Sequence, residues 1–382
     1  MTLICQYIWD MPALIGDALL TSPSYKNDDI PLLTHINEHL TNSPYGYVAG
    51  LAQKASVISP TLAIAWTGDF RPAEYLLKLI AEEEDKNPLT PREIEEVLCK
   101  GLPKASALGN VTLVGMSTTG IAGPSNEQVC FPFGYNAACT SRGPLHALTT
   151  EGSGRKIFFD ALEANVNGPP SPPNFPRGIA LALKATSMLM NFELRSGRTL
   201  KQGFGANYDI ITVDRNEGLC NVGPRLQLLW ELGQLHNRKP YLWLMPFMIR
   251  TSYRDHVSLN QIIRLQGSIQ ANDLAIAWKL NRTICPIFRD YPVGYEIVDP
   301  SVDVNFISNA VLVRRPIFKG SEETGQFDLS GRAVTLPIGF SEKDGVTYIT
   351  LSNVMLDCLL DAFVEFFKID RPIIVSELPA RQ

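Results

Sequence analysis

The first residues of the chain combine a hydroxyl and a carboxylate in a pattern that suits nucleophilic catalysis. Thr2 follows Met1, and threonine is small enough for methionine aminopeptidase to remove Met1 and leave a free α-amino group on Thr2. A hydroxyl and an amine of pKa about 7.7 to 8 would then share one residue and supply a nucleophile with its own general base. Many proteins simply begin with Met-Thr, so Thr2 is a candidate nucleophile that needs partners.

Four other residues could supply those partners. Asp17 lies 15 positions after Thr2, and Gly68 lies 14 positions after Lys54. Lys54 held charged by Asp17 would place a positive field beside Thr2, and the N–H of Gly68 would stabilise a tetrahedral oxyanion. Ser153, between two glycines, could relay protons or could simply cap a helix. Asp17 and Lys54 could equally form a structural ion pair or be unrelated surface charges.

Other kinds of site find less support in the sequence. Cys5 is an alternative nucleophile, but it lies inside a predicted strand, and three further residues would have to be removed to expose its amine. The seven cysteines are scattered without a CxxC pair, and the five histidines show no spacing to a serine or cysteine that indicates a triad. Because no phosphate-binding glycine motif occurs either, we expect no cofactor and no metal.

Composition limits the classes of partner. The 382 residues are 45% hydrophobic and 19% charged, with a net charge of −5, which is typical of a globular chain and gives no general affinity for nucleic acid. No stretch reaches the roughly 18 uninterrupted apolar residues of a membrane-spanning helix, and the start of the chain lacks the basic residues of a secretory signal. We therefore expect a cytoplasmic protein without nucleic-acid or membrane partners.

The candidate residues stand at the ends of predicted elements. Residues 2–9 and 13–20 are predicted to form a hairpin, and residues 53–59 and 61–66 a second hairpin with its turn near Pro60. Apolar residues at helical spacing predict two helices next, the second capped by Thr90 with Glu93 three positions on. The predicted helices are 72–84, 91–100, 156–164 and 177–194, and the further strands are 110–116, 128–133 and 208–213. This order predicts an α+β fold, a four-layer αββα sandwich of two antiparallel sheets between helical layers.

The order of these elements, together with the residues between them, resembles the N-terminal nucleophile (Ntn) hydrolases, and among them the proteasome β-subunit-like branch. That family places a nucleophilic threonine on the first strand, an aspartate at the end of the second, a lysine at the start of the third and an oxyanion glycine at the end of the fourth. Thr2, Asp17, Lys54 and Gly68 occupy these places, and Gly-Ser-Gly around Ser153 resembles the family's assisting serine. Lys54 is preferred over Lys26 because of the residues that follow it.

The resemblance implies an amide- or peptide-bond hydrolase that works through an acyl-enzyme on Thr2, with a peptide or amide substrate and a possible homo-oligomer. It covers residues 2–215, slightly over half of the chain. Where the family usually has an aspartate and a serine, this chain has Gln-Gly-Phe-Gly-Ala-Asn at 202–207. That departure favours the alternative, a catalytically inactive Ntn-fold protein acting as a binding or assembly module.

The second half resembles no family. We expect the apolar runs 226–232 and 241–249 to complete the sheets of the first domain, and residues 259–265 and 273–280 to form helices. Residues 305–314 are predicted as a strand, 333–340 and 346–351 as a hairpin, and 353–368 as an amphipathic helix. The expected organisation is thus a first domain, 1–215, and a C-terminal α/β extension, 216–382, packed on it.

Overall fold

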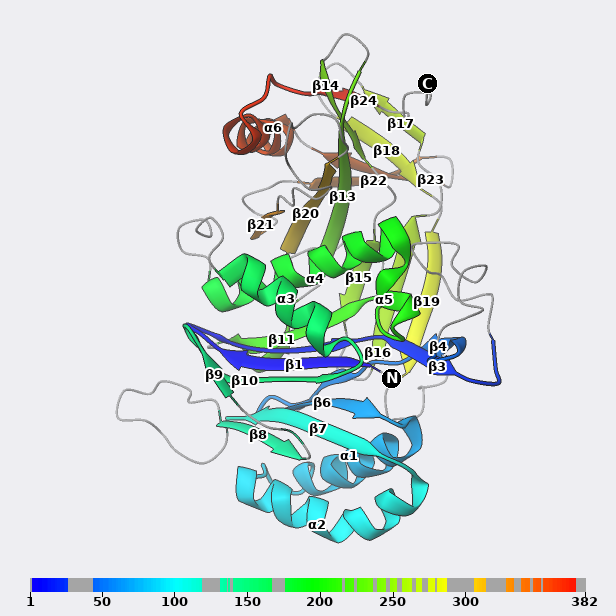
Figure 1. The fold of residues 1–382 in the computed structure, drawn as a ribbon, viewed down its shortest axis with the longest axis vertical. Coiled ribbons are helices and arrows are strands. Elements are labelled where there is room, and N and C mark those ends of the chain that lie inside the picture. Colours follow the sequence, from blue (N-terminus) through cyan, green and yellow to red (C-terminus); the bar gives the residue numbers. More distant parts are fainter. Residues whose placement is uncertain are drawn as a thin grey trace. The chain divides into compact units, whose positions relative to one another are not determined.

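The computed structural model describes nineteen stretches of the chain (Figure 1). They are residues 2–26, 44–118, 131–135, 137, 140–166, 176–214, 217–222, 225–235, 239–244, 248–252, 256–262, 266–269, 274–278, 280–286, 306–313, 328–332, 338–343, 346–351 and 353–375. The chain divides into two compact units. Unit 1 contains 1–222, 252–258 and 284–297, and unit 2 contains 223–251, 259–283 and 298–382. The first boundary thus falls at 222, seven residues after the expected 215.

One antiparallel sheet of unit 1 begins with the first strand of the chain. Its order is β12-β11-β2-β1-β10-β9. The strands are β1 (Leu3–Ile8), β2 (Pro12–Asp17), β9 (Thr140–Arg142), β10 (Leu145–Gly152), β11 (Tyr208–Asp214) and β12 (Gly218–Asn221). The predicted first hairpin is confirmed, with Ile4 opposite Gly16. The alternation in β10 is interrupted by register shifts and by a positive φ at Ala147, and this explains why no strand was predicted there.

The second sheet of unit 1 contains the second predicted hairpin, which is also confirmed. Its order is β5-β6-β7-β8, with β5 (Ala55–Ser59), β6 (Leu62–Gly68), β7 (Val111–Ser117) and β8 (Phe131–Tyr135). A separate pair, β3 (Leu19–Ser22) and β4 (Tyr47–Leu51), was not predicted. The single strand expected at 13–20 is interrupted at Ala18, which lies between β2 and β3 and whose N–H donates to the carbonyl oxygen of Asn207 (2.9 Å).

Two helices cover the second sheet. Helix α1 (Phe70–Glu84) contacts β5, β6 and β7, and α2 (Pro91–Leu108) packs on α1 and β7. The predicted Thr90–Glu93 capping box is present at the start of α2. This helix extends eight residues beyond the predicted end at Lys100, and Gly101 has a packing role there, since a Cβ on it would lie 2.8 Å from Leu76 and Leu79 of α1.

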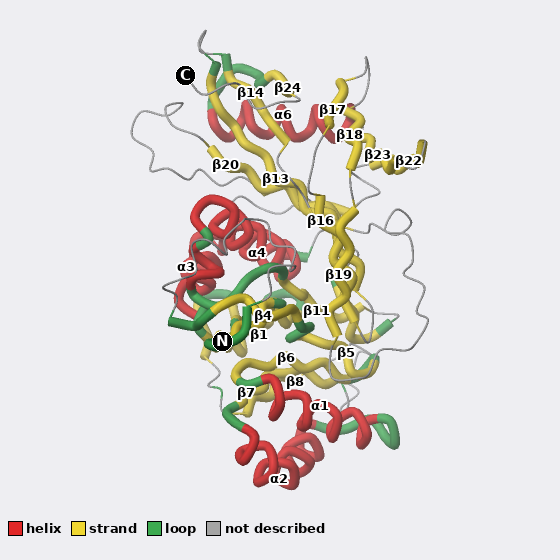
Figure 2. The backbone as a smooth tube through the Cα atoms, turned by 90° about the vertical axis from the view of Figure 1, so that its right-hand side faces the viewer, coloured by secondary structure: helices red, strands yellow, loops and turns green. Residues whose placement is uncertain are grey.

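The helices α3 (Arg155–Val166) and α4 (Arg177–Ser196) cover the first sheet, and the short α5 (Arg198–Lys201) follows. Helix α3 contacts β1 and β10, while α4 contacts β2 and β11. Figures 1 and 2 show these helices on one side of that sheet and the second sheet on its other side. Along β6, Leu62, Ile64 and Trp66 belong to the core beneath α1 and α2, whereas Ala63 and Ala65 belong to the core between the two sheets.

The described residues of 226–232 and 241–249 belong to an eight-stranded sheet that is separate from the sheets of β1 and β5, so the expectation that these runs complete the sheets of the first domain is wrong. Strands β13 (Arg225–Gln234) and β14 (Pro240–Leu244) pair with each other, and each also has a parallel neighbour, β20 (Phe306–Val313) and β24 (Ile373–Val375). Strand β21 (Asp328–Arg332) pairs with β20, and β15 (Met248–Ser252) with β13. The strands β15, β16 (His256–Ile262) and β19 (Leu280–Pro286) contain residues of both units.

The described residues of the helices expected at 259–265 and 273–280 lie in strands, so that prediction is also wrong. Residues 263–265, 273 and 279 lie outside the described residues. The four-stranded sheet of this half has the order β17-β18-β23-β22, with β17 (Gln266–Ile269), β18 (Leu274–Trp278), β22 (Ile338–Lys343) and β23 (Val346–Leu351). In β18 the large residues Leu274, Ile276 and Trp278 alternate with alanines, a period-2 signal that short length made ambiguous.

The other predictions for the second half are largely confirmed. The strand expected at 305–314 is β20, the second strand of the hairpin is β23, and the helix is α6 (Asn353–Phe367). Residues 333–337, expected to begin the hairpin, lie outside the described residues. The chain is therefore a mixed α+β protein with several antiparallel sheets. In the described part of the chain, no helix is long and apolar enough to span a membrane.

Candidate functional site

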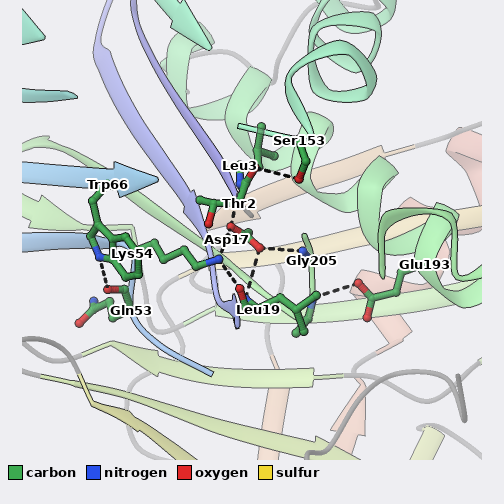
Figure 3. Close-up of polar contacts among 11 residues, drawn as sticks. Thr2, Leu3, Asp17, Leu19, Gln53, Lys54, Trp66, Ser153, Glu193 and Gly205 are labelled. Carbon is green, nitrogen blue, oxygen red and sulfur yellow. Dashed lines mark hydrogen bonds and ion pairs between the residues drawn. The ribbon is translucent and has the colours of Figure 1, made fainter. Parts of the chain in front are cut away.

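Asp17 is the centre of a buried polar cluster in unit 1 (Figure 3). Its Oδ1 accepts hydrogen bonds from the Leu3 N–H at 2.9 Å and from Lys54 Nζ at 3.0 Å. Its Oδ2 accepts from the Gly205 N–H at 2.8 Å and from the Leu19 N–H at 3.2 Å. These four donors come from β1, β3, the residue before β5 and the loop before β11, so the carboxylate joins four separate segments of the chain.

Lys54 lies immediately before β5, and its side chain is fully buried. The ammonium donates to Asp17 and also to the carbonyl oxygen of Leu19. Trp66 supports the lysine, because the ammonium lies 5.9 Å from the centroid of the indole ring and the indole N–H donates to the Gln53 carbonyl oxygen at 3.3 Å. The lysine is thus fixed by a carboxylate, a carbonyl and an aromatic ring.

Burial shifts the pKa of both members of this pair. Desolvation lowers the pKa of Lys54 from its ordinary value, and the Asp17 charge opposes that shift. Desolvation also raises the pKa of Asp17, while the Lys54 ammonium and the N–H groups of Leu3 and Gly205 oppose the rise. The two pKa values are therefore displaced toward each other, as expected for a charge pair excluded from water.

Thr2 is held directly beside this pair. The peptide N–H that links Thr2 to Leu3 is the one bound to Asp17, and only 1% of Thr2 is exposed. The Thr2 carbonyl oxygen accepts hydrogen bonds from the Gly154 N–H at 3.3 Å and from the Ser153 hydroxyl at 3.4 Å. The structure therefore brings together four of the residues predicted for the site: Thr2, Asp17, Lys54 and Ser153.

Gly152 explains how the beginning of β1 meets the end of β10. A Cβ on Gly152 would lie 2.0 Å from the Thr2 carbonyl oxygen and 3.1 Å from the Thr67 hydroxyl, and its φ is +96°. Only glycine permits this approach. The same geometry brings the end of β6 close to Thr2, and Gly68 is the residue that follows Thr67.

Gly68 has a structural requirement of its own. It pairs with Val111 at the end of β6 with a φ of +108°, and a Cβ there would lie 2.3 Å from the Asn110 carbonyl oxygen. The strand pairing therefore explains a glycine at this position, whether or not its N–H also serves an oxyanion. The hydroxyl of its neighbour Thr67 lies near Gly152, at the end of β10 that meets Thr2.

Gly205 and Glu193 belong to the cluster, and sequence reasoning missed both. The segment 202–207 supplies the Gly205 N–H to Asp17, and the next amide, the Ala206 N–H, donates to Glu193 Oε2 at 3.0 Å. Glu193 is fully buried, and burial raises its pKa to about 7. The signal in the sequence for this turn was the pair Gly203 and Gly205, since glycine favours the positive φ that both residues adopt.

The alternatives that the sequence left open are less favourable in the structure. Lys26 is exposed, so Lys54 is the lysine paired with Asp17. Cys5 is buried in β1, where desolvation raises the pKa of its thiol to about 12 and disfavours the reactive thiolate. Within the described stretches, no group of three or more His, Cys, Asp or Glu residues could hold a metal ion.

No protein-family model and no curated protein sequence matches the chain. Function has to be inferred from the geometry around Asp17.

Proposed function

We propose that unit 1 is a cytoplasmic Ntn-type hydrolase domain of the proteasome β-subunit-like kind, which cleaves an amide or peptide bond with Thr2 as nucleophile. The contacts within unit 1 support a four-layer αββα arrangement. Helices α1 and α2 pack on the β5–β8 sheet, α3 and α4 pack on the sheet containing β1, and a continuous apolar core with Ile4, Leu14 and Val114 lies between the sheets.

The observation that carries the proposal is the buried Lys54–Asp17 pair beside Thr2. Removing two charges from water is costly, and well-packed apolar residues can replace such pairs without loss of stability. Fixing the end of β2 would not require a lysine, since backbone N–H donors already hold Asp17. An ammonium 3.0 Å from the carboxylate oxygen that also binds the Thr2–Leu3 amide is explained by a need for positive charge at Thr2.

The residues have distinct tasks in the proposed reaction. The Thr2 hydroxyl oxygen attacks the carbonyl carbon of the scissile amide, and its proton passes to the free α-amino group of Thr2. The Lys54 field favours the developing alkoxide, and the Gly68 N–H donates a hydrogen bond to the negative oxygen of the tetrahedral species. The C–N bond then breaks as the α-ammonium group of Thr2 returns the proton to the leaving amine. Water hydrolyses the resulting ester, and Ser153 orients the Thr2 main chain through its carbonyl oxygen.

Covalent labelling tests the proposal. The purified chain is treated with a threonine-directed β-lactone or epoxyketone, and intact-mass and peptide analysis locate the adduct. We expect a chain that begins at Thr2 and carries one adduct on that residue, with Thr2→Ala unlabelled and Thr2→Ser still labelled. A chain that keeps Met1, or a properly folded chain that forms no adduct, would contradict the proposal.

A second candidate is a catalytically inactive member of the same fold that serves as a binding or assembly module. The observation in its favour is the burial of Thr2, which leaves 1% of the residue exposed. Two cavities of unit 1 lie elsewhere: one of about 380 Å³ beside Arg198 and Lys201, and one of about 180 Å³ lined by Leu145, Phe159 and their neighbours. Absence of labelling together with a stable homo-oligomer in solution would favour this candidate.

A further inference from the structure

Glu193 is a buried acid that the proposed reaction does not use. It lies in α4, and none of its surface is exposed. Its Oε2 accepts hydrogen bonds from the Ala206 N–H at 3.0 Å and from the Thr199 hydroxyl at 3.2 Å. Its other oxygen, Oε1, has no hydrogen-bond partner among the described residues. A buried carboxyl group with one unsatisfied oxygen calls for a reason beyond packing.

The turn that Glu193 holds has an unusual backbone conformation. Gly205 and Ala206 have φ values of +125° and +64°, and the second is uncommon for a residue with a Cβ. A Cβ on Gly205 would lie 2.4 Å from Glu193 Oε2, so the carboxyl group packs directly on the turn. The hydrogen bond from the Ala206 N–H to Glu193 is one of the contacts that hold this turn.

The same turn reaches the catalytic pair. Gly205 donates its N–H to Asp17 Oδ2 at 2.8 Å, and the next N–H, from Ala206, goes to Glu193. The Gly205 and Asn207 carbonyl oxygens both accept from the Ala18 N–H, which follows Asp17 in the chain. Two consecutive amides therefore connect two buried carboxyl groups, and any displacement of the turn at Glu193 moves a donor of Asp17 (Figure 3).

We propose that Glu193 is a positioning residue for the Asp17–Lys54 pair, that it acts through the Gly205–Ala206 turn, and that its ionisation makes the site sensitive to pH. This inference rests on the proposed function in its reference to catalysis. The structural coupling between Glu193 and Asp17 can be measured without any activity.

The charged and titratable groups around Glu193 define the direction of this sensitivity. Asp17 of β2 and Tyr208 of β11 interact electrostatically with it, and Lys54 lies beyond Asp17. The cations of α5, Arg198 and Lys201, are on exposed residues. Burial, with a smaller contribution from Asp17, raises the pKa of Glu193 to about 7. Near neutral pH, ionisation would strengthen the bond to Ala206 and place a second negative charge near Asp17.

Three variants of the full chain separate positioning from general stability. Glu193→Gln keeps an acceptor oxygen for Ala206 but cannot ionise, whereas Glu193→Leu removes the acceptor. Glu84→Leu is the matched control, because Glu84 is another buried carboxylate of unit 1 that holds a loop N–H and hydroxyl groups, at Leu89, Ser59 and Thr61. The rate of β-lactone labelling at Thr2 is measured between pH 5.5 and 8.5 for each variant at about micromolar protein.

We expect Glu193→Leu to slow labelling by about tenfold or more, and Glu193→Gln and Glu84→Leu to remain within about threefold of the parent. The parent should show a change in rate near pH 7 that Glu193→Gln lacks. Labelling of Glu193→Leu at the parent rate would overturn the inference and leave the proposed function standing. If Glu193→Leu does not fold, the pH profile decides, and an unchanged profile in Glu193→Gln overturns the inference.

Unfolding measurements test the inference even if the parent chain is not labelled. Absence of labelling would by itself contradict the proposed function. A double-mutant cycle combines Glu193→Gln with Asp17→Asn, and a control cycle combines Glu84→Gln with Asp17→Asn. We expect the unfolding equilibrium constants to show a coupling of about fivefold or more in the first cycle and about none in the second. Equal coupling in the two cycles would overturn the positioning role.

Discussion

Two buried carboxylates in unit 1, Glu84 and Asp17, hold loops in place, and they differ in whether a cation binds them. Glu84, at the end of α1, is 5% exposed and accepts hydrogen bonds from the Leu89 N–H at 2.6 Å, the Thr61 hydroxyl at 2.7 Å and the Ser59 hydroxyl. Asp17, at the end of β2, accepts three backbone N–H bonds and, in addition, the ammonium of Lys54. Among the described residues, no cation pairs with Glu84.

The difference separates what folding requires from what chemistry requires. Glu84 shows that a buried carboxylate in this fold can be satisfied by N–H and hydroxyl donors alone, without a second buried charge. Burial of Asp17 therefore does not by itself require Lys54. The position of Lys54 beside the Thr2–Leu3 amide supports a functional role instead.

The largest effect is expected for Lys54→Met. Removing the ammonium leaves the buried Asp17 charge unpaired, which should destabilise the fold by about 3–5 kcal/mol. Denaturant unfolding measures this loss, and labelling at Thr2 should be abolished in the population that remains folded. A variant as stable and as reactive as the parent would mean that Asp17 needs no cation and that the contrast with Glu84 is unimportant.

Asp17→Asn combined with Lys54→Met provides the control for that experiment. Neutralising both partners removes the unpaired charge, so the double variant should be more stable than Lys54→Met alone while remaining unreactive. Recovery of stability without recovery of labelling would separate the two roles of the pair. Recovery of both would assign Lys54 to structure.

The next effect concerns Glu193 and is a dependence of stability on pH. Its pKa is raised from 4.5 to about 7 by burial, so the folded state binds the proton more tightly than the unfolded state between these values. The stabilisation is complete below about pH 4.5 and is lost as the pH rises through 7, by at most about 3 kcal/mol. Glu193→Gln lacks this loss, so its stability relative to the parent should increase from pH 4.5 to 7.

Unfolding curves at several pH values test that sign. If the difference between Glu193→Gln and the parent is constant over this range, Glu193 does not titrate as the burial of its carboxyl group requires.

The smallest effect is expected for Glu84→Ala. The change leaves the Leu89 N–H buried without its acceptor, which should cost about 1–3 kcal/mol of unfolding free energy. The rate of labelling at Thr2 should stay at the parent value when it is measured on the folded protein. A large loss of reactivity would show that any buried carboxylate of unit 1 affects the site, and the distinction from Asp17 would disappear.

Local patterns in the first half were sufficient to predict most of its elements. The two hairpins, the capping box at Thr90 and the helices α1, α3 and α4 follow from alternation, helical spacing and turn residues. Strand β10 was missed because a bulge interrupts its alternation, and β18 was taken for a helix because a short apolar run fits either period. Both errors arise where pairing with a distant strand decides the conformation.

The sequence by itself determined the candidate residues Thr2, Asp17 and Lys54, because their types and their places at predicted strand ends are local properties. Only the tertiary structure decided that Asp17 and Lys54 share a fully buried ion pair, and that Gly205 and Glu193 support it from 188 and 176 residues away. The physical reason is that burial and the pairing of backbone donors depend on segments distant in sequence, and no local pattern records them.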